Sequence, residues 1–199
     1  MGVAGRDYCV IAADTRMSLN YNIMTRNKPK CAQITSNCVL ASCGMQADIE
    51  AFQKLIKTRA AEYEHLHGHA MSTRAVAQLV STNLYYRRFF PFYTFNLVAG
   101  LDELGRGVVY GYDAVGSFDS VGYGAQGSGS TLAFSLLDNQ VSCETHPGKK
   151  DMSVEEAVQL LQDAFTSVGE RDIYTGDSVD LFVISAAGTE VRRFALKRD

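Results

Sequence analysis

Ala12-Ala13-Asp14-Thr15-Arg16 is the stretch of this 199-residue sequence that decides the fold, together with Lys30 and the run Ala41-Ser42-Cys43-Gly44. Residues 8–13 form a short apolar run that ends at Asp14, which indicates a buried strand. Lys30 stands at the head of the next apolar run, so an acid ends one strand and an amine begins another. We therefore expect Asp14 and Lys30 to form a buried pair at the mouth of a sheet.

The first half of the chain predicts a hairpin followed by two helices. Residues 17–28 are polar and predict a loop, whereas 31–34 and 38–42 flank a turn and predict paired strands. An apolar stripe at helical spacing predicts a helix from about residue 47, carried by Ile49, Phe52, Ile56 and Tyr63. We expect His65 to His69 to form a loop, and residues 73–87 to form a second helix.

The second half predicts strands, one or two helices and more strands. Strands are expected at 95–100, 107–113, 119–124, 180–186 and 190–194, and a helix at 130–137. Ser153 and Glu156 have the spacing of a capping box that opens another helix. Segregated blocks of strands and helices are typical of α+β proteins. No repeat or linker interrupts the sequence, so we expect residues 1–199 to form a single domain.

Composition limits the classes of partner. Net charge is −3 without a block of like charge, which argues against a nucleic-acid partner, and no apolar run approaches the roughly 20 residues of a membrane helix. Cysteines stand at 9, 31, 38, 43 and 143, an odd number without a CxxC pair. Free thiols in a reducing compartment explain this pattern better than a zinc site or a disulfide framework.

Several motifs in order resemble one known family. Besides the opening stretch they include 127–130, 170–177, the segment Arg87 to Tyr93, and 138–140. Together they resemble the β-type subunits of the proteasome, and are most similar to the non-catalytic sixth member of the eukaryotic β ring. The resemblance implies the fold of the N-terminal nucleophile hydrolases, a four-layer αββα sandwich of two antiparallel sheets.

The resemblance also implies a set of site residues. In catalytic members an N-terminal threonine attacks the peptide carbonyl and its own amine is the base. Asp14, Lys30 and Gly44 match the aspartate, the lysine and the oxyanion-hole glycine of that chemistry. The supporting polar set is matched by Ser130, Asp172 and Thr175, the last in place of the more usual serine.

The nucleophile itself is not among these matches. The thioether of Met1 has no proton to lose, and an internal residue such as Thr15 has no free amine. We therefore expect a non-catalytic structural subunit of the 20S core particle, a vestigial catalytic shell, no cofactor and no metal. The alternative is an active N-terminal threonine endopeptidase whose nucleophile lies upstream of this chain.

The resemblance further implies partners and location. The expected partners are the other α and β subunits of a stacked-ring particle that carries out ATP- and ubiquitin-dependent protein degradation in cytoplasm and nucleus. Protein substrates of the complex are also expected, but no nucleic acid and no membrane. Asp113 is expected to wall the catalytic pocket of a neighbouring subunit, although the residues alone favour a solvated strand end.

Three other motifs suggest different functions. Residues 122–127 fit GxGxxG, but the following helix is short and no βαβ unit surrounds it, so a tight turn is favoured over a dinucleotide site. The triplet His65, His67 and His69 lacks flanking carboxylates or thiols and favours a solvated loop over a metal site. Arg87 to Tyr93 could stack on single-stranded nucleic acid, but an acidic chain favours a buried or subunit-facing aromatic cluster.

Overall fold

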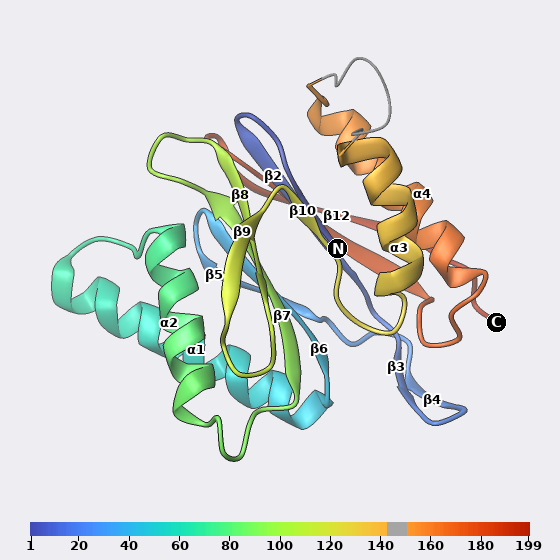
Figure 1. Ribbon diagram of the computed structural model, residues 1–199, viewed down its shortest axis with the longest axis horizontal. Helices are drawn as coiled ribbons and strands as arrows, with labels where there is room; N and C mark the ends of the chain where they lie inside the picture. Colours follow the sequence, from blue (N-terminus) through green and yellow to red (C-terminus); the bar gives the residue numbers. More distant parts are fainter. Residues whose placement is uncertain (143–150) are drawn as a thin grey trace.

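Two five-stranded sheets are stacked between two layers of helices in the computed structural model, which describes residues 1–142 and 151–199 (Figure 1). The first sheet, in spatial order, contains β10 (Tyr123–Gly124), β1 (Gly2–Ala4), β2 (Tyr8–Asp14), β11 (Ser178–Ser185) and β12 (Gly188–Ala195). The second contains β5 (Cys31–Thr35), β6 (Cys38–Gly44), β7 (Thr94–Leu101), β8 (Gly107–Tyr112) and β9 (Phe118–Val121). All pairings within both sheets are antiparallel. The predicted α+β, four-layer αββα sandwich is confirmed.

The helix layers cover the outer faces of the two sheets. Beside the second sheet lie α1 (Gln46–His67) and α2 (Thr73–Tyr86), and beside the first lie α3 (Ser130–Leu137) and α4 (Val154–Gly169). A short π-helix, η1 (Asp138–Ser142), continues α3. This arrangement leaves the ends of the sheets uncovered, and the sequence motifs of the site gather at one of those ends.

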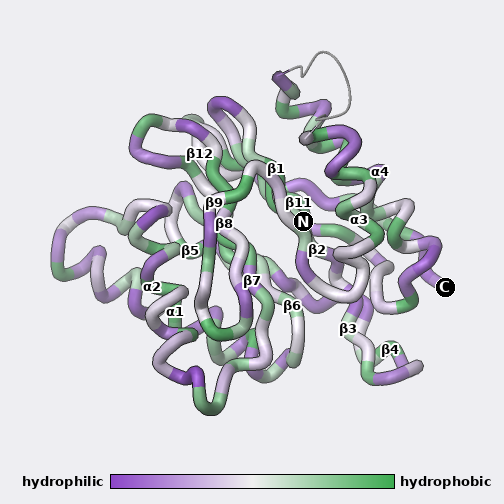
Figure 2. The backbone as a smooth tube through the Cα atoms, viewed as in Figure 1, coloured by the Kyte–Doolittle hydropathy of each residue, from purple (hydrophilic) through white to green (hydrophobic). Residues whose placement is uncertain are grey.

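Successive side chains along each strand point to opposite faces of its sheet, and this divides the core into three layers. In β2, Val10 packs toward α3 and α4, whereas Cys9 and Ile11 pack between the sheets. In β6, Leu40 packs toward α1 and α2, and Val39 faces the other sheet. Because both faces of these strands are buried, their sequences are apolar almost without interruption. Figure 2 shows hydrophobic strand segments in the interior and a hydrophilic connection between α1 and α2.

The helices begin and pack largely as their sequences predict. Ile49, Phe52 and Ile56 of α1 are fully buried, which confirms the apolar stripe, and Tyr63 is half-buried. In α4 the predicted capping box is present. The Ser153 hydroxyl accepts a hydrogen bond from the backbone N–H of Glu156, whose carboxylate accepts one from the backbone N–H of Ser153.

The predicted loop at 17–28 is wrong over most of its length. β3 (Met17–Leu19) and β4 (Asn22–Thr25) form a separate two-stranded hairpin that projects from the sandwich (Figure 1). Its turn places Asn20 in the left-handed region at φ 53°, which asparagine tolerates better than most residues. The strands are only three and four residues long, and none of their side chains belongs to a core layer, so no hydrophobic alternation reveals them.

Two boundaries also differ from prediction. His65 and His67 belong to α1, which continues to Gly68, where a left-handed φ of 73° ends it. The single strand expected at 119–124 is two strands in different sheets: Val121 pairs with β8, whereas Tyr123 pairs with β1. The chain crosses between the sheets at Gly122. Cys143 lies outside the described residues.

Candidate functional site

Asp14 and Lys30 meet where the two sheets open at one end of the sandwich. β2 ends at Asp14, and Lys30 directly precedes β5 of the other sheet. Lys30 Nζ donates to Asp14 Oδ1 at 2.6 Å, and their side chains are only 17% and 10% exposed, respectively. The backbone of Lys30 is fixed too, because its carbonyl accepts hydrogen bonds from Ser42 N and Gln53 Nε2. The expected pair is therefore present and held from both sheets.

The second carboxylate oxygen of Asp14 is also occupied. Asp14 Oδ2 accepts hydrogen bonds from the backbone N–H groups of Arg16 at 3.3 Å and Gly176 at 3.4 Å. These bonds tie β2 to the loop at 172–177, which precedes β11. Both carboxylate oxygens of Asp14 are therefore occupied by donors, and the site presents a closed ion pair rather than a free base.

Gly44 ends β6 in a conformation that requires glycine. Its φ is 122°, and a Cβ there would lie 2.3 Å from the carbonyl oxygen of Tyr93. Gly44 and Lys30 line the same cleft, which has a volume of about 920 Å³ and also contacts Asp14 and Ser130. The expected oxyanion-hole glycine thus lies beside the ion pair, on a backbone that only glycine adopts without strain.

Asp172 and Thr175 come together at the wall of this cleft, in the loop after α4. Asp172 Oδ2 accepts hydrogen bonds from the hydroxyls of Thr175 and Ser128, both at 2.7 Å. Ser130 lies in the first turn of α3 and lines the cleft, but its hydroxyl makes no hydrogen bond to the rest of the described chain. Sequence reasoning missed Ser128, although Gly127-Ser128-Gly129-Ser130 contains both serines.

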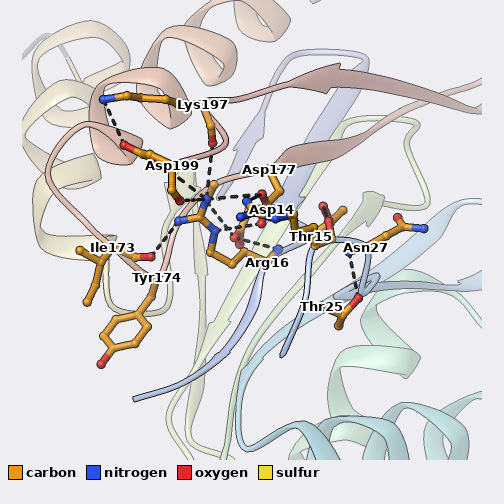
Figure 3. A network of polar contacts seen from close by, with 12 residues as sticks. Asp14, Thr15, Arg16, Thr25, Asn27, Ile173, Tyr174, Asp177, Lys197 and Asp199 are labelled. Atoms are coloured by element: carbon orange, nitrogen blue, oxygen red, sulfur yellow. Dashed lines mark hydrogen bonds and ion pairs between the residues drawn. The ribbon is translucent and has the colours of Figure 1, made fainter. Parts of the chain in front are cut away.

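A buried arginine network behind the ion pair was not predicted (Figure 3). Arg16 Nε donates to Asp177 Oδ2 at 2.9 Å, and Arg26 Nη1 donates to Asp177 Oδ1 at 2.5 Å. Arg16 also donates to the carbonyls of Ile173 and Asp199, from the loop and the end of the described chain. The side chains of Arg16 and Asp177 are 3% and 1% exposed.

The charge of Asp177 is stabilised by this network. Burial raises the pKa of its carboxyl, but the hydrogen bonds and charges of Arg16 and Arg26 outweigh burial and hold the pKa below the ordinary value of 3.8. Asp177 also has a positive φ of 71°, so it holds the loop in an unusual conformation. Its place at the end of the motif 170–177 was the sequence signal that could have identified it.

Comparison with known proteins assigns the family. A match to the family described as "Proteasome subunit" covers residues 1–184. The chain belongs to the proteasome subunit family. It is 53% identical over 203 residues to "Proteasome subunit beta type-1" of Dictyostelium discoideum, covering all of this chain and 86% of that protein. Proteins with the same description in Arabidopsis thaliana and Drosophila melanogaster are 47% and 43% identical, with 92% and 86% of their lengths covered.

Burial favours the neutral form of the four thiols that the structure of this proteasome β subunit describes. Burial raises the pKa of Cys31 to about 12 and also raises that of Cys43, whose side chain reaches the cleft. Cys9 and Cys38 are fully buried. Because the thiolate is the reactive species, Cys43 is a poor nucleophile at neutral pH.

Asp113 lies away from the cleft, in the turn between β8 and β9. Asp113 Oδ1 accepts hydrogen bonds from the N–H groups of Val115 at 3.0 Å and Ser117 at 2.8 Å. The residue is exposed, and these two contacts stabilise the turn. The structure therefore gives Asp113 a local role in its turn, and its role toward a neighbouring subunit stays a prediction.

The glycine-rich motif and the histidine triplet lie in or beside regular secondary structure. The glycines at 122–127 span β10 and the approach to an eight-residue helix, within antiparallel sheets rather than a βαβ unit. Within 1–142 and 151–199, no three His, Cys, Asp or Glu side chains are placed to hold a metal ion. His67 instead packs against the Tyr63 ring, with centroids 4.3 Å apart. Among the described helices, none is long and apolar enough to cross a membrane.

Proposed function

We propose that this chain is a non-catalytic structural subunit of the 20S proteasome core particle, folded as one domain over residues 1–199. Relatives described as beta type-1 subunits match the chain over its full length, which supports a place in the β ring. The chain would support ATP- and ubiquitin-dependent protein degradation in cytoplasm and nucleus by shaping the ring. Its partners would be the other α and β subunits.

The observation that carries the non-catalytic assignment lies at the cleft, where the Asp14–Lys30 pair is closed and the Ser128 and Thr175 hydroxyls pair with a carboxylate rather than with an amine or an imidazole. Lys30 Nζ is 2.6 Å from Asp14 Oδ1, and the other Asp14 oxygen accepts two backbone N–H groups. Two hydroxyls at the cleft, on Ser128 and Thr175, donate to Asp172. A carboxylate alone is a weak base for a hydroxyl, and no histidine or amine contacts either of them in the part of the chain described here.

A structural pair and a catalytic pair differ in what their loss changes. If the pair only supports the fold, removal of the lysine charge reduces assembly but leaves every assembled particle fully active. If the pair activates a nucleophile, the same change abolishes one peptidase activity per particle, because the local field favours deprotonation.

The test is a Lys30→Met substitution in cells that assemble the whole particle. We expect fewer particles, but unchanged hydrolysis of each standard fluorogenic peptide per mole of purified particle. Lys54→Met, on the exposed face of α1, is the matched control and leaves both yield and activity unchanged. Selective loss of one peptidase activity per particle in Lys30→Met would refute the structural assignment.

A further inference from the structure

An exposed cluster of aromatic and arginine side chains occupies the end of α2 and the loop to β7. We call it the aromatic–arginine patch; it consists of Tyr85, Tyr86, Arg87, Arg88, Phe89, Phe90 and Tyr93. Phe89, Tyr86 and Phe90 are 88%, 85% and 84% exposed. Figure 1 shows this loop at the lower edge of the molecule, away from both sheet faces. Contiguous exposed apolar side chains of this kind mark interaction sites.

The patch is ordered before any partner binds. The Arg88 guanidinium lies 4.5 Å from the ring centroids of both Tyr85 and Phe89, and Arg87 lies 4.4 Å from that of Phe92. Backbone hydrogen bonds from Arg88 N to the Tyr85 carbonyl and from Phe90 N to the Arg87 carbonyl close successive turns. Little conformational entropy is left to lose on binding, which favours affinity.

The loop is also fixed to the fold at its far end. Phe92 is buried in the core layer beneath α1 and α2, with its ring centroid 5.2 Å from that of Phe52. The backbone N–H of Tyr93 donates to Asp48 Oδ2 at 2.7 Å, at the start of α1. The exposed side chains are therefore presented on a rigid support, as in interface hot spots rather than in mobile loops.

The two arginines define the chemistry of the partner. Their faces are stacked on aromatic rings, which leaves the N–H donors at the guanidinium edges available. Arg88 uses one donor for the Tyr85 carbonyl, and neither Arg87 nor Arg88 forms an ion pair with any residue of 1–142 or 151–199. A planar guanidinium edge binds carboxylates in a bidentate way, so the complementary surface is acidic as well as apolar.

We propose that the aromatic–arginine patch is an interface with another proteasome subunit, whose contact surface is apolar and bears Asp or Glu carboxylates that pair with Arg87 and Arg88. The inference rests on the proposed function, since it names a surface by which this chain joins the particle. Tyr, Phe and Arg are the residue types enriched in the cores of such interfaces. A nucleic acid would supply phosphates instead of carboxylates, and that outcome contradicts the proposal.

The first experiment identifies the occupant directly. The photoreactive residue p-benzoylphenylalanine replaces Phe90 in the full chain, expressed in cells with the other subunits, and cross-linked peptides are identified by mass spectrometry. We expect one other proteasome subunit, cross-linked through a peptide adjacent to Asp or Glu. Cross-links to nucleic acid, to lipid, to a second copy of this chain or to no partner within the particle would each overturn the proposal.

The second experiment measures what the patch contributes to assembly. In Phe89→Ser/Phe90→Ser and in Arg87→Gln/Arg88→Gln we expect incorporation of the tagged chain into the particle to fall roughly tenfold or more. Arg87→Lys/Arg88→Lys keeps the charge but cannot bind in a bidentate way, and we expect an intermediate loss. The control is Leu66→Ser, 77% exposed at the end of α1, for which we expect no loss.

The outcomes separate this proposal from the proposed function. If the unmodified chain does not enter the particle, the proposed function fails. If the unmodified chain enters but the patch variants enter equally well, only the patch proposal fails. The substituted side chains are exposed, so thermal unfolding of each purified variant should match that of the unmodified chain. For any variant that unfolds at a lower temperature, cross-linking at position 90 tests the interface in its place.

Discussion

At the residue scale, the positions of the charged side chains around Asp14 account for the structure of the site better than any single sequence motif does. The Asp14–Lys30 pair follows from two strand ends in sequence, and it was predicted. Arg16 and Asp177 were not, because their partnership spans 161 residues and no local pattern links them. Ser128 was missed for a related reason. The sequence alone does not show whether Ser128 or Ser130 lies next to Asp172, and the structure places Ser128 there.

Asp177→Asn provides a test of the arginine network with a defined pH dependence. The substitution removes the nearest counter-ion of the buried Arg16 charge, so we expect a loss of about 3–5 kcal/mol in the free energy of unfolding at pH 7. The pKa of Asp177 is lowered in the folded state, so its stabilisation is present above about pH 4 and is lost as pH falls through the folded value.

Urea unfolding of the purified chain between pH 7 and pH 3 measures this dependence. The difference between Asp177→Asn and the unmodified chain should shrink as the pH falls below 4. Asp163→Asn, an exposed position on α4, should show little difference at any pH. A constant difference across the range would show that the Asp177 charge does not stabilise the fold.

At the element scale, sequence patterns predicted those elements that bury one or two apolar faces. β2, β6 and the stripe of α1 fall in this group, and so does α4 with its cap. The β3–β4 hairpin escaped prediction because its strands have three and four residues and pack on neither core layer. β9 and β10 were merged because only tertiary pairing shows that the chain changes sheets at Gly122.

The cap of α4 gives a prediction for a whole element. Ser153→Ala removes the acceptor for the backbone N–H of Glu156, and we expect about 1 kcal/mol less stability toward unfolding. Ser120→Ala, an exposed strand position, serves as the control and should change stability little. Thermal or urea unfolding of both variants gives the comparison, and equal stability of the two would mean that the cap contributes nothing.

At the scale of the whole molecule, the stacked sheets place the two halves of the site on different sheets. Asp14 comes from the first sheet, whereas Lys30 and Gly44 come from the second. Segregated strand and helix blocks predicted α+β, but the layer order came from the family resemblance rather than from periodicity. The sequence left Arg87 to Tyr93 as either buried or subunit-facing, and only the structure shows that Phe89, Phe90 and Tyr93 are exposed.

Asp113 supplies a test of the predicted contact with the catalytic pocket of a neighbouring subunit. Asp113→Asn keeps the Oδ1 acceptor for Val115 and Ser117 but removes the negative charge. If Asp113 walls a neighbour's pocket, we expect an altered KM for basic or acidic peptides in one activity of the purified particle, with kcat nearly unchanged. Asp119→Asn, exposed on β9, is the control. Identical kinetics in the two variants would show that Asp113 stabilises its turn but does not affect the neighbouring pocket.

We propose that this subunit holds the shell of a catalytic site without acting as a protease. The most direct measurement is the intact mass of each subunit after the purified particle reacts with an epoxyketone probe, which labels N-terminal threonine nucleophiles. We expect catalytic neighbours to gain the mass of the probe and this chain to keep its own mass. A stoichiometric mass increase on this chain would contradict the proposal.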